Sequence, residues 1–242
     1  MPDGLTISYS GAVAQSEALE AAASNLANAS TVGFRAQRPV FAQVLAASPE
    51  VGGATQRGVF VRETRLDLSQ GPVRATGNPL DVALRGPGFL SVATSAGERY
   101  TRAGHLSLSR EGTLVTAAGQ TVQGEGGQPI RVDSRGAVSI TPDGTVQVLG
   151  AAVGRLKIVE FADPGRLEPE GEGLLRAPDE AQPRPASSTD VLQGHLEQSN
   201  VNVVRGLTDL VRISRAHDAF HRTIQTLREI DQRAANDLAA KR

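Results

Sequence analysis

The sequence of 242 residues contains no cysteine and no tryptophan, and only two tyrosines and six phenylalanines. The lack of cysteine excludes disulfides, cysteine-ligated metal sites and thiol nucleophiles. Because aromatic residues are scarce, any core must be built from aliphatic residues and alanine, although the chain is long enough to bury one. The net charge is only −1, so the composition does not favour binding to nucleic acid or to an anionic membrane.

Long apolar runs are also missing. No segment approaches the roughly 18 apolar residues that a transmembrane helix requires. The first residues, MPDGLTISYSG, lack the basic start and continuous apolar centre of a secretory signal peptide. We therefore expect no direct membrane insertion, and a protein that is either cytoplasmic or exported without a cleaved signal peptide.

Hydrophobic patterning divides the chain into zones. Residues 5–28 are rich in alanine and poor in proline, and they predict a helix that stops where Gly33 can adopt a left-handed conformation. Residues 58–162 contain short alternating runs such as FLSVAT and TVQVL, separated by turn signals such as REGT and PDGT. Closely spaced strands without helices between them predict an antiparallel β domain.

The segments on either side of these strands are less regular. Residues 34–75 are predicted to be a connecting segment within the β-rich domain. Residues 163–190 contain five prolines and predict a long surface loop with one strand near Leu174. The predicted fold class is α+β, mainly β, with two terminal helices that form a coiled coil around a β-rich middle domain. The predicted domains are residues 1–33 (N-terminal helix), 34–195 (β-rich domain) and 196–242 (C-terminal helix).

From about Asn202 to Leu238 the pattern is helical again. Selected positions recur at alternating steps of four and three residues, which is typical of a coiled-coil seam. The predicted seam consists of Ile213, His217, Phe220, Ile224, Leu227, Asp231, Ala234 and Leu238. Residues 1–34 carry three acidic and no basic residues, whereas residues 205–242 carry eight basic and five acidic ones. Opposite charges favour pairing of the two ends, although two solvated faces can also differ by chance.

Asparagines stand at both boundaries between helix and β domain. Asn25 and Asn28 lie three residues apart on one helical face, and Asn200 and Asn202 precede the last helix, where either could cap it. A buried amide in an apolar seam fixes register, because a slipped partner leaves it unpaired. Helix capping and turn formation explain the first pair as well. The second pair favours a role at the junctions.

Patterns for chemistry are weak. His217 and His221 share a helical face in HDAFH, but two ligands do not make a structural zinc site and the glutamate of a zincin is absent. Neither a G-x-S-x-G motif nor a local Ser/His/Asp set occurs. We therefore predict a protein that is not an enzyme, with no catalytic residue, no metal, no cofactor and no small-molecule substrate.

Four motifs together resemble the flagellar basal-body rod and hook family. They are SNLANASTVGFRAQ, TGNPLDVALRGPGFLSV, YTRAGHLSL and GHLEQSNVNVV, and the likeness covers residues 1–41, 76–124 and 192–238. The outer motifs are carried by Asn25, Leu26, Asn28, Gly33, Phe34, Leu196, Ser199, Asn200, Val201 and Asn202. The middle motifs are carried by Pro79, Leu80, Asp81, Gly86, Gly88, Phe89, Tyr100, Thr101 and Arg102. Arg35 stands where many relatives have lysine.

The resemblance implies a structural subunit of the rod, the shaft that crosses the periplasm in the flagellar basal body. In that family the terminal helices pair and pack against other subunits, while the β domain faces outward. The expected partners are other rod proteins, copies of this chain and the flagellar type III export apparatus. The short segment between Phe41 and Leu80 makes the chain more similar to proximal-rod members than to distal-rod or hook members, which stay as alternatives.

Two alternatives belong to other classes. One is a rod-associated hydrolase that uses a carboxylate pair of the β domain on peptidoglycan, and the other is a secreted β-rich binding module. On the rod hypothesis, Asn25 and Asn28 penalise wrong registers between subunits and Gly33 lets the backbone turn. Phe34, with Phe41 nearby, would then seat the following strand against the β domain.

Overall fold

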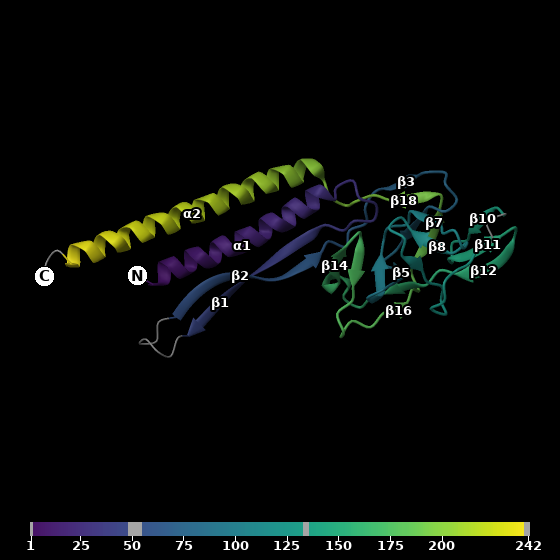
Figure 1. The fold of residues 1–242 in the computed structure, drawn as a ribbon, viewed down its shortest axis with the longest axis horizontal. Helices are drawn as coiled ribbons and strands as arrows, with labels where there is room; N and C mark the ends of the chain where they lie inside the picture. Colours follow the sequence, from purple (N-terminus) through teal and green to yellow (C-terminus); the bar gives the residue numbers. More distant parts are fainter. Residues whose placement is uncertain (1, 48–54, 133–135, 240–242) are drawn as a thin grey trace. The chain divides into compact units, whose positions relative to one another are not determined.

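The computed structural model describes residues 2–47, 55–132 and 136–239, with side chains described in residues 7–42, 61–132, 136–233 and 236. Contacts divide the chain into two units. The helical unit comprises Met1–Ala27, Gln37–Arg65 and Asn202–Arg242, and the β unit comprises Asn28–Ala36 and Leu66–Val201. Terminal helices and a middle of antiparallel strands are visible in Figure 1, and the predicted α+β class, mainly β, is confirmed.

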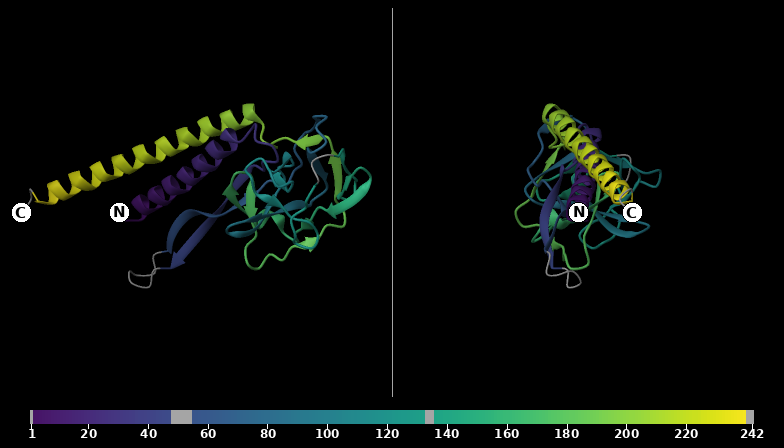
Figure 2. Two further views of the ribbon diagram at one scale, coloured as in Figure 1. Left: turned by 45° about the vertical axis from the view of Figure 1, so that its right-hand side comes forward. Right: turned by 90° about the vertical axis from the view of Figure 1, so that its left-hand side faces the viewer.

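The helical unit contains two helices and a β-hairpin. Its elements are α1 (Pro2–Ala27), β1 (Gln37–Ala47), β2 (Thr55–Leu66) and α2 (Val203–Ala239). The helices run antiparallel, and α1 contacts both α2 and β1, lying between α2 and the hairpin (Figures 1 and 2). Neither helix, as far as it is described, carries an apolar stretch that could span a bilayer.

Small residues explain how α1 fits between two layers. Its buried side chains are Ser8, Ser10, Ala12, Ala14, Ala18 and Ala21. At Gly11 a Cβ atom would lie only 2.6 Å from Cε1 of Phe220 on α2. The ring of Phe220 therefore packs against the backbone of α1, which is the close approach that glycine permits in a helix interior.

The β unit is built around one large antiparallel sheet. Its strands are β5 (Phe89–Thr94), β6 (Gly97–Thr101), β7 (Leu106–Leu108), β8 (Leu114–Thr116), β9 (Thr121–Val122), β13 (Ile158–Glu160), β14 (Glu168–Gly171), β15 (Leu174–Arg176) and β16 (Arg184–Pro185). The main path runs β14-β15-β6-β5-β9-β8-β7, and β13 joins β5 to β16.

Three smaller sheets complete the β unit. Their strands are β3 (Val73–Ala75), β4 (Val82–Arg85), β10 (Val138–Ile140), β11 (Thr145–Val148), β12 (Ala151–Arg155), β17 (Asp190–Gln193) and β18 (His195–Glu197). Strands β10, β11 and β12 form one sheet, β4 pairs with β17, and β3 pairs with β18. The last two pairings bring the segment that precedes α2 back onto the beginning of the β unit.

The core of the β unit is aliphatic, as the scarcity of aromatic residues predicts. Its largest cluster includes Val82, Leu84, Leu90, Val92, Leu106, Leu114, Val122, Val146, Leu156 and Val191. A second cluster gathers three of the few aromatic rings, with Phe161 edge-on to Phe89 at 6.1 Å and to Tyr100 at 4.8 Å between ring centroids. Burial, assisted by the nearby Glu98, raises the pKa of Tyr100 to about 12.

The structure corrects the predicted surface loop. Residues 163–190 contain strands β14, β15 and β16 and a short 3-10 turn, Pro164–Arg166, instead of one strand near Leu174. Proline lacks the N–H that an interior strand must donate, so a proline-rich segment argues against a strand. Here Pro169 lies in the edge strand β14 and Pro185 in β16, which pairs only with β13, so the missing donors are tolerated.

The segment expected to connect the first helix to the β domain is also more ordered. Residues 34–75 contain the strands β1 and β2 of the hairpin and the short strand β3. Pro39 conceals β1 in the sequence, but each strand of a two-stranded sheet has a free edge where a proline fits. The predicted first helix is too long as well, because α1 ends at Ala27 and not at residue 33.

Candidate assembly interface

A tight turn follows the end of α1. The N–H of Thr31 donates to the carbonyl of Asn28 at 3.1 Å, and the Thr31 hydroxyl lies 3.1 Å from the Asn28 side-chain oxygen. Gly33 then adopts φ +71°, the left-handed conformation expected from the sequence. Its N–H donates to the carbonyl of Glu197 at 2.8 Å, and a Cβ would lie 2.4 Å from the backbone of Arg102. The position excludes a side chain on two independent grounds.

The amide of Asn25 is fully engaged inside the helical unit. Its Nδ2 donates to the Gln37 carbonyl at 2.8 Å, and the Gln37 N–H donates to its Oδ1 at 2.7 Å. This pair of bonds links the last turn of α1 to the first residue of β1. The arrangement agrees with the turn-forming alternative, in which the amide serves the chain itself and not a neighbouring subunit. Leu26 is half-buried in the same turn.

A buried ionic cluster lies in the β unit between the segments that follow α1 and precede α2. Nη2 of Arg35 lies 2.7 Å from Oε1 of Glu197, and Nη1 of Arg102 lies 3.4 Å from Oε2 of the same carboxylate. The three side chains are at most 4% exposed. We call Arg35, Arg102 and Glu197, together with Asn200, the junction cluster.

Hydrogen bonds to backbone satisfy most of this buried charge. Glu197 Oε1 also accepts the Gly71 N–H at 3.0 Å, and Arg35 donates to the Ser69 carbonyl. Arg102 donates to the carbonyls of Leu84 and Gly86, and its guanidinium carbon lies 5.0 Å from the centroid of the Phe89 ring. Buried charges persist only when paired and hydrogen-bonded in this way.

Two cations share one anion in the junction cluster. Burial, and next the charge of Arg35, lower the pKa of Arg102 to about 10. Burial also lowers the pKa of Arg35, against the opposing attraction of Glu197. In both cases Glu197 is the largest opposing attraction, with smaller ones from Asp67 on Arg35 and from Glu160 on Arg102. The cluster therefore depends chiefly on the Glu197 carboxylate.

Asn200 completes the junction with its side-chain amide. Its Oδ1 accepts the Ala36 N–H at 2.7 Å, and its Nδ2 donates to the carbonyls of Asp67 and Ser69 at 2.9 and 3.0 Å. Three chain segments are thus held by one side chain. Asn200 does not cap α2, whereas Asn202 does: the Arg205 N–H donates to its Oδ1 at 3.0 Å.

The remaining residues predicted at the junction take lesser parts. Leu196 and Ser199 are buried, and the Ser199 hydroxyl accepts the N–H of the half-buried Val201 at 3.2 Å. Phe34 is half-buried, and its carbonyl accepts the Asn200 N–H at 3.4 Å. Phe41 is 45% exposed in the helical unit, so it does not help to seat the strand in the way the sequence suggested.

Five of the eight residues predicted for the α2 seam lie on the less exposed side of this helix, where Phe220 approaches Gly11 of α1. Ile224 is buried, and Ile213, His217, Phe220 and Leu227 are half-buried, whereas Asp231 is exposed. Ala234 and Leu238 belong to α2 but lie outside the residues whose side chains are described.

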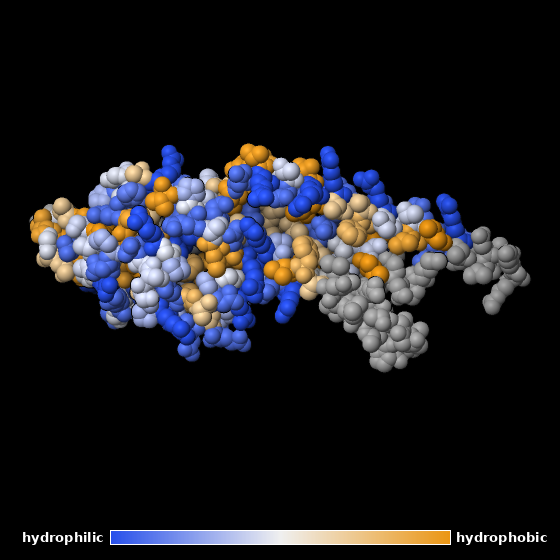
Figure 3. Space-filling view, turned by 180° about the vertical axis from the view of Figure 1, so that it is seen from behind, coloured by the Kyte–Doolittle hydropathy of each residue, from blue (hydrophilic) through white to orange (hydrophobic). Residues whose placement is uncertain are grey.

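A second apolar stripe lies on the first turns of α2. Val204 is 76% exposed, Leu207 49% and Val211 48%, at the three- and four-residue steps of one helical face. Figure 3 shows this part of α2 as a hydrophobic region on the surface. Val203, beside the stripe, is exposed as well. Tyr9 and Val13 on α1 are also exposed, but α1 passes Phe220 at Gly11, so they do not belong to this stripe. Contiguous exposed apolar residues indicate a surface that another protein covers.

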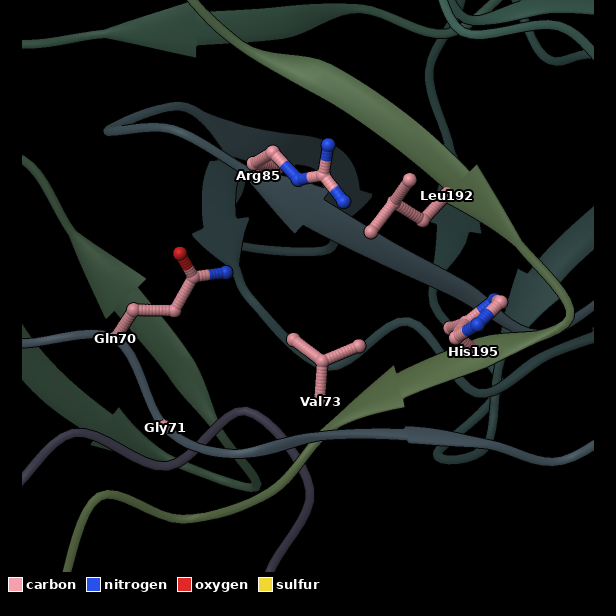
Figure 4. Close-up of a pocket in the computed structure, with 6 residues that line it drawn as sticks. All are labelled: Gln70, Gly71, Val73, Arg85, Leu192 and His195. Carbon is pink, nitrogen blue, oxygen red and sulfur yellow. The ribbon is translucent and has the colours of Figure 1, made fainter.

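The β unit also has an open groove of about 690 Å³, lined by Gln70, Gly71, Val73, Arg85, Leu192 and His195 (Figure 4). Gln70 donates to the Leu84 carbonyl at 2.8 Å, and Nδ1 of His195 lies 2.7 Å from the Gln193 carbonyl. No carboxylate occurs among these described lining residues. The groove does not assemble a general acid and base from side chains of its own.

The sequence located the junction but missed its ionic centre. Glu197 lies inside the motif GHLEQSNVNVV, Arg35 inside SNLANASTVGFRAQ and Arg102 inside YTRAGHLSL, yet nothing in their spacing connects the three. One local signal exists: Leu196 and Glu197 are both buried although they are neighbours on β18, where alternation would expose one.

Comparisons with known proteins agree with this arrangement. Residues 5–35 match the family "Flagella basal body rod protein", residues 83–148 match "Flagellar hook protein FlgE/F/G D1 domain", and residues 192–238 match "Flagellar basal body rod FlgEFG protein C-terminal". The two outer matches contain most of α1 and α2 with their junction residues. The middle match covers strands of the β unit.

Relatives match along nearly the whole chain. The flagellar basal-body rod protein FlgF of Caulobacter vibrioides is 32% identical over 98% of both chains. FlgF of Salmonella typhimurium is 37% identical over 88% of both chains. The rod protein FlgG of Buchnera aphidicola is 32% identical over 93% of this chain and 96% of its own. The chain belongs to the flagellar basal-body rod protein family, as a FlgF-like member.

Proposed function

We propose that the protein is a structural subunit of the flagellar rod whose α1–α2 pair packs against other subunits through the exposed apolar stripe of α2. As a rod-family protein it belongs to the flagellar basal body and assembles with other rod components and with copies of itself. The observation that carries the proposal is the stripe of Val204, Leu207 and Val211 on a helix whose opposite face is already used by α1. Burying such a stripe drives association.

Finer features of the function follow from the same proposal. The subunit would occupy the proximal rod in the periplasm and reach it through the type III export apparatus without a cleaved signal peptide. None of the described residues that line the groove is a carboxylate, which supports a role without catalysis. Asn25 and Asn28 would act by holding the end of α1 against β1 and the following turn, and so present α1 correctly to neighbours.

The test replaces the stripe with polar residues. Val204→Asn with Leu207→Asn, expressed in a strain deleted for its own copy, should abolish swarming and leave basal bodies without a complete rod in electron micrographs. The matched control is Leu149→Asn, because Leu149 is 79% exposed in the β unit with φ +50°, where asparagine is favoured. Normal rods with the double variant would overturn the proposal.

A second variant tests the junction asparagines. Asn25→Leu with Asn28→Leu should leave the β unit folded, since neither side chain enters its core, yet impair rod assembly. Tyrosine fluorescence of Tyr100 reports folding of the β unit, and motility reports assembly. Wild-type motility from this variant would contradict the proposed role of the two amides.

A further inference from the structure

Two histidines on α2 form a pair outside the exposed apolar stripe of Val204, Leu207 and Val211. His217 and His221 lie four residues apart, and their Nε2 atoms are 3.1 Å from each other. The ring centroids are 4.4 Å apart, with an interplanar angle of 64°. His221 is exposed and His217 is half-buried. The two Nε2 atoms therefore face each other at hydrogen-bond distance, on a pair of side chains of which one is exposed.

The separation of these nitrogens is one that a metal ion can bridge. An ion about 2.0–2.1 Å from each nitrogen holds them about 3 Å apart at a right-angle bite and about 3.4 Å apart at the tetrahedral angle. The observed 3.1 Å lies between these limits. Histidines at positions i and i+4 are also the spacing by which a single helix presents two ligands to zinc.

A neighbouring carboxylate favours the tautomer that metal binding needs. Oδ1 of Asp218 lies 3.8 Å from Nδ1 of His217. At that distance it attracts a proton on Nδ1 without a full hydrogen bond. A ring protonated on Nδ1 has its lone pair on Nε2, the atom that faces His221.

We propose that His217 and His221 form a two-nitrogen chelate for a borderline divalent transition-metal ion, namely Cu²⁺, Ni²⁺ or Zn²⁺. Neutral imidazole suits these ions, whereas Mg²⁺ and Ca²⁺ prefer oxygen ligands. Binding replaces the hydrogen bond between the two Nε2 atoms. The ring that donated it moves its proton to Nδ1 by exchange with water, both Nε2 lone pairs go to the ion, and no net proton is released.

The site is a chelate and not a closed structural site. Within the described residues, no group of three or more His, Cys, Asp or Glu side chains could hold a metal. Water therefore completes the coordination shell in the isolated chain, and Cu²⁺ binds most tightly, following the general order of affinities. Because the ion joins two successive turns, it stabilises α2. Two histidines on one helical face fall short of a structural zinc site, which is why the sequence predicts no metal; the 3.1 Å separation of their Nε2 atoms is what the structure adds.

The test titrates the full-length, untagged chain with CuCl₂ and, separately, with ZnCl₂. Electron paramagnetic resonance should show one Cu²⁺ with hyperfine splitting from two nitrogens. Circular dichroism should show that one equivalent of Zn²⁺ raises the melting temperature of the helical signal, or raises the helical signal itself if the free helices are partly unfolded. A spectrum with a single nitrogen, or no effect on the helix, would overturn the proposal.

Matched variants distinguish Cu²⁺ binding by the His217–His221 pair from binding by single histidines elsewhere in the chain. His221→Gln should weaken Cu²⁺ binding by about tenfold or more, because a lost ligand costs at least as much as a lost outer-shell partner. His221→Ala with Arg222→His keeps the number of histidines but spaces them by five, and should weaken binding as much. His105→Gln with His195→Gln should bind as the parent does. Parent-like affinity of the respaced variant would contradict the chelate.

Discussion

Arg35 and Glu197 form a 2.7 Å ion pair in which both side chains are almost fully buried, although one follows the first helix and the other precedes the last. The pair, extended by Arg102 and Asn200, joins the two chain segments that leave the β unit toward α1 and α2. Since this tie lies wholly within the β unit, it forms without help from another subunit. Within the β unit, the ion pair therefore holds the residues that follow α1 next to those that precede α2.

Removing the carboxylate of Glu197 should destabilise the β unit strongly. Glu197→Gln removes the ion-pair partner of two buried guanidinium groups, so the free energy of unfolding should fall by about 3–5 kcal/mol. Urea unfolding followed by the fluorescence of the buried Tyr100, in a Tyr9→Phe background, measures this loss. The control is Glu168→Gln, because the ion pair of Glu168 with Arg176 is more than half exposed and should matter by less than about 1 kcal/mol. If both variants had the same free energy of unfolding, the buried ion pairs of Glu197 would contribute no more to stability than the exposed pair of Glu168.

Gly33 and Gly77 have nearly the same φ, +71° and +75°, but different surroundings. Gly77 has open space where a Cβ would lie, so Gly77→Ala should cost only the left-handed conformation, about 1–2 kcal/mol. Gly33→Ala adds a clash with the backbone of Arg102 and Ala103, worth about 1–3 kcal/mol more. Urea unfolding of both variants measures the difference. If the two substitutions cost the same, the turn does not pack against the backbone of Arg102 and Ala103 as tightly as described.

Gly11 and Phe220 should be energetically coupled. In the parent, Gly11→Ala forces the Phe220 ring away from α1 and should lower the melting temperature of the helical circular-dichroism signal. In a Phe220→Leu background the clash is relieved, so the same change should raise it, because alanine favours a helix by about 1 kcal/mol over glycine. The double-mutant cycle gives the coupling energy, expected at about 0.5–3 kcal/mol. The same sign in both backgrounds would argue against this contact.

Asp143 should titrate well below its usual range. The hydroxyls of Thr141 and Thr145 donate to its carboxylate, at 2.6 Å for Thr145, and lower its pKa from 3.8 to about 2. Because the pKa of the folded state lies below that of the unfolded state, ionised Asp143 stabilises the turn above about pH 4, and this contribution is lost as the pH falls through about 2. An NMR titration of the carboxyl carbon measures the midpoint, and Thr145→Val should raise it. A midpoint near 3.8 in the parent would contradict the hydrogen-bonded turn.

Local patterns were sufficient for much of the fold. Alternating runs such as FLSVAT and TVQVL became β5 and β11, and the three- and four-residue steps of the last helix identified the face that packs on α1. In each case the burial of one face leaves a periodic record in nearby residues. The same holds for Gly33, whose left-handed turn is a local property of the chain.

Features that depend on distant partners could not be predicted. Nothing in their own motifs distinguishes the charged residues Arg35, Arg102 and Glu197. They form ion pairs only in the folded chain, where β3 pairs with β18 and distant segments come together. Asn25 illustrates the same limit, because its spacing from Asn28 left a register role and a turn-forming role open and could not identify the backbone of Gln37 as its partner. The prolines of β14 and β16 led to the prediction of a loop for a related reason, since only the sheet topology shows that those strands lie at edges.

The edge strand β14 affects whether copies of the chain can aggregate through their sheet edges. All four residues of β14 are exposed, and they combine Pro169 with the carboxylates of Glu168 and Glu170. A proline offers no backbone proton to an incoming strand, and the charges oppose a second sheet edge. Strand β14 therefore disfavours edge-to-edge pairing between copies of this chain, the kind of contact that leads to uncontrolled aggregation.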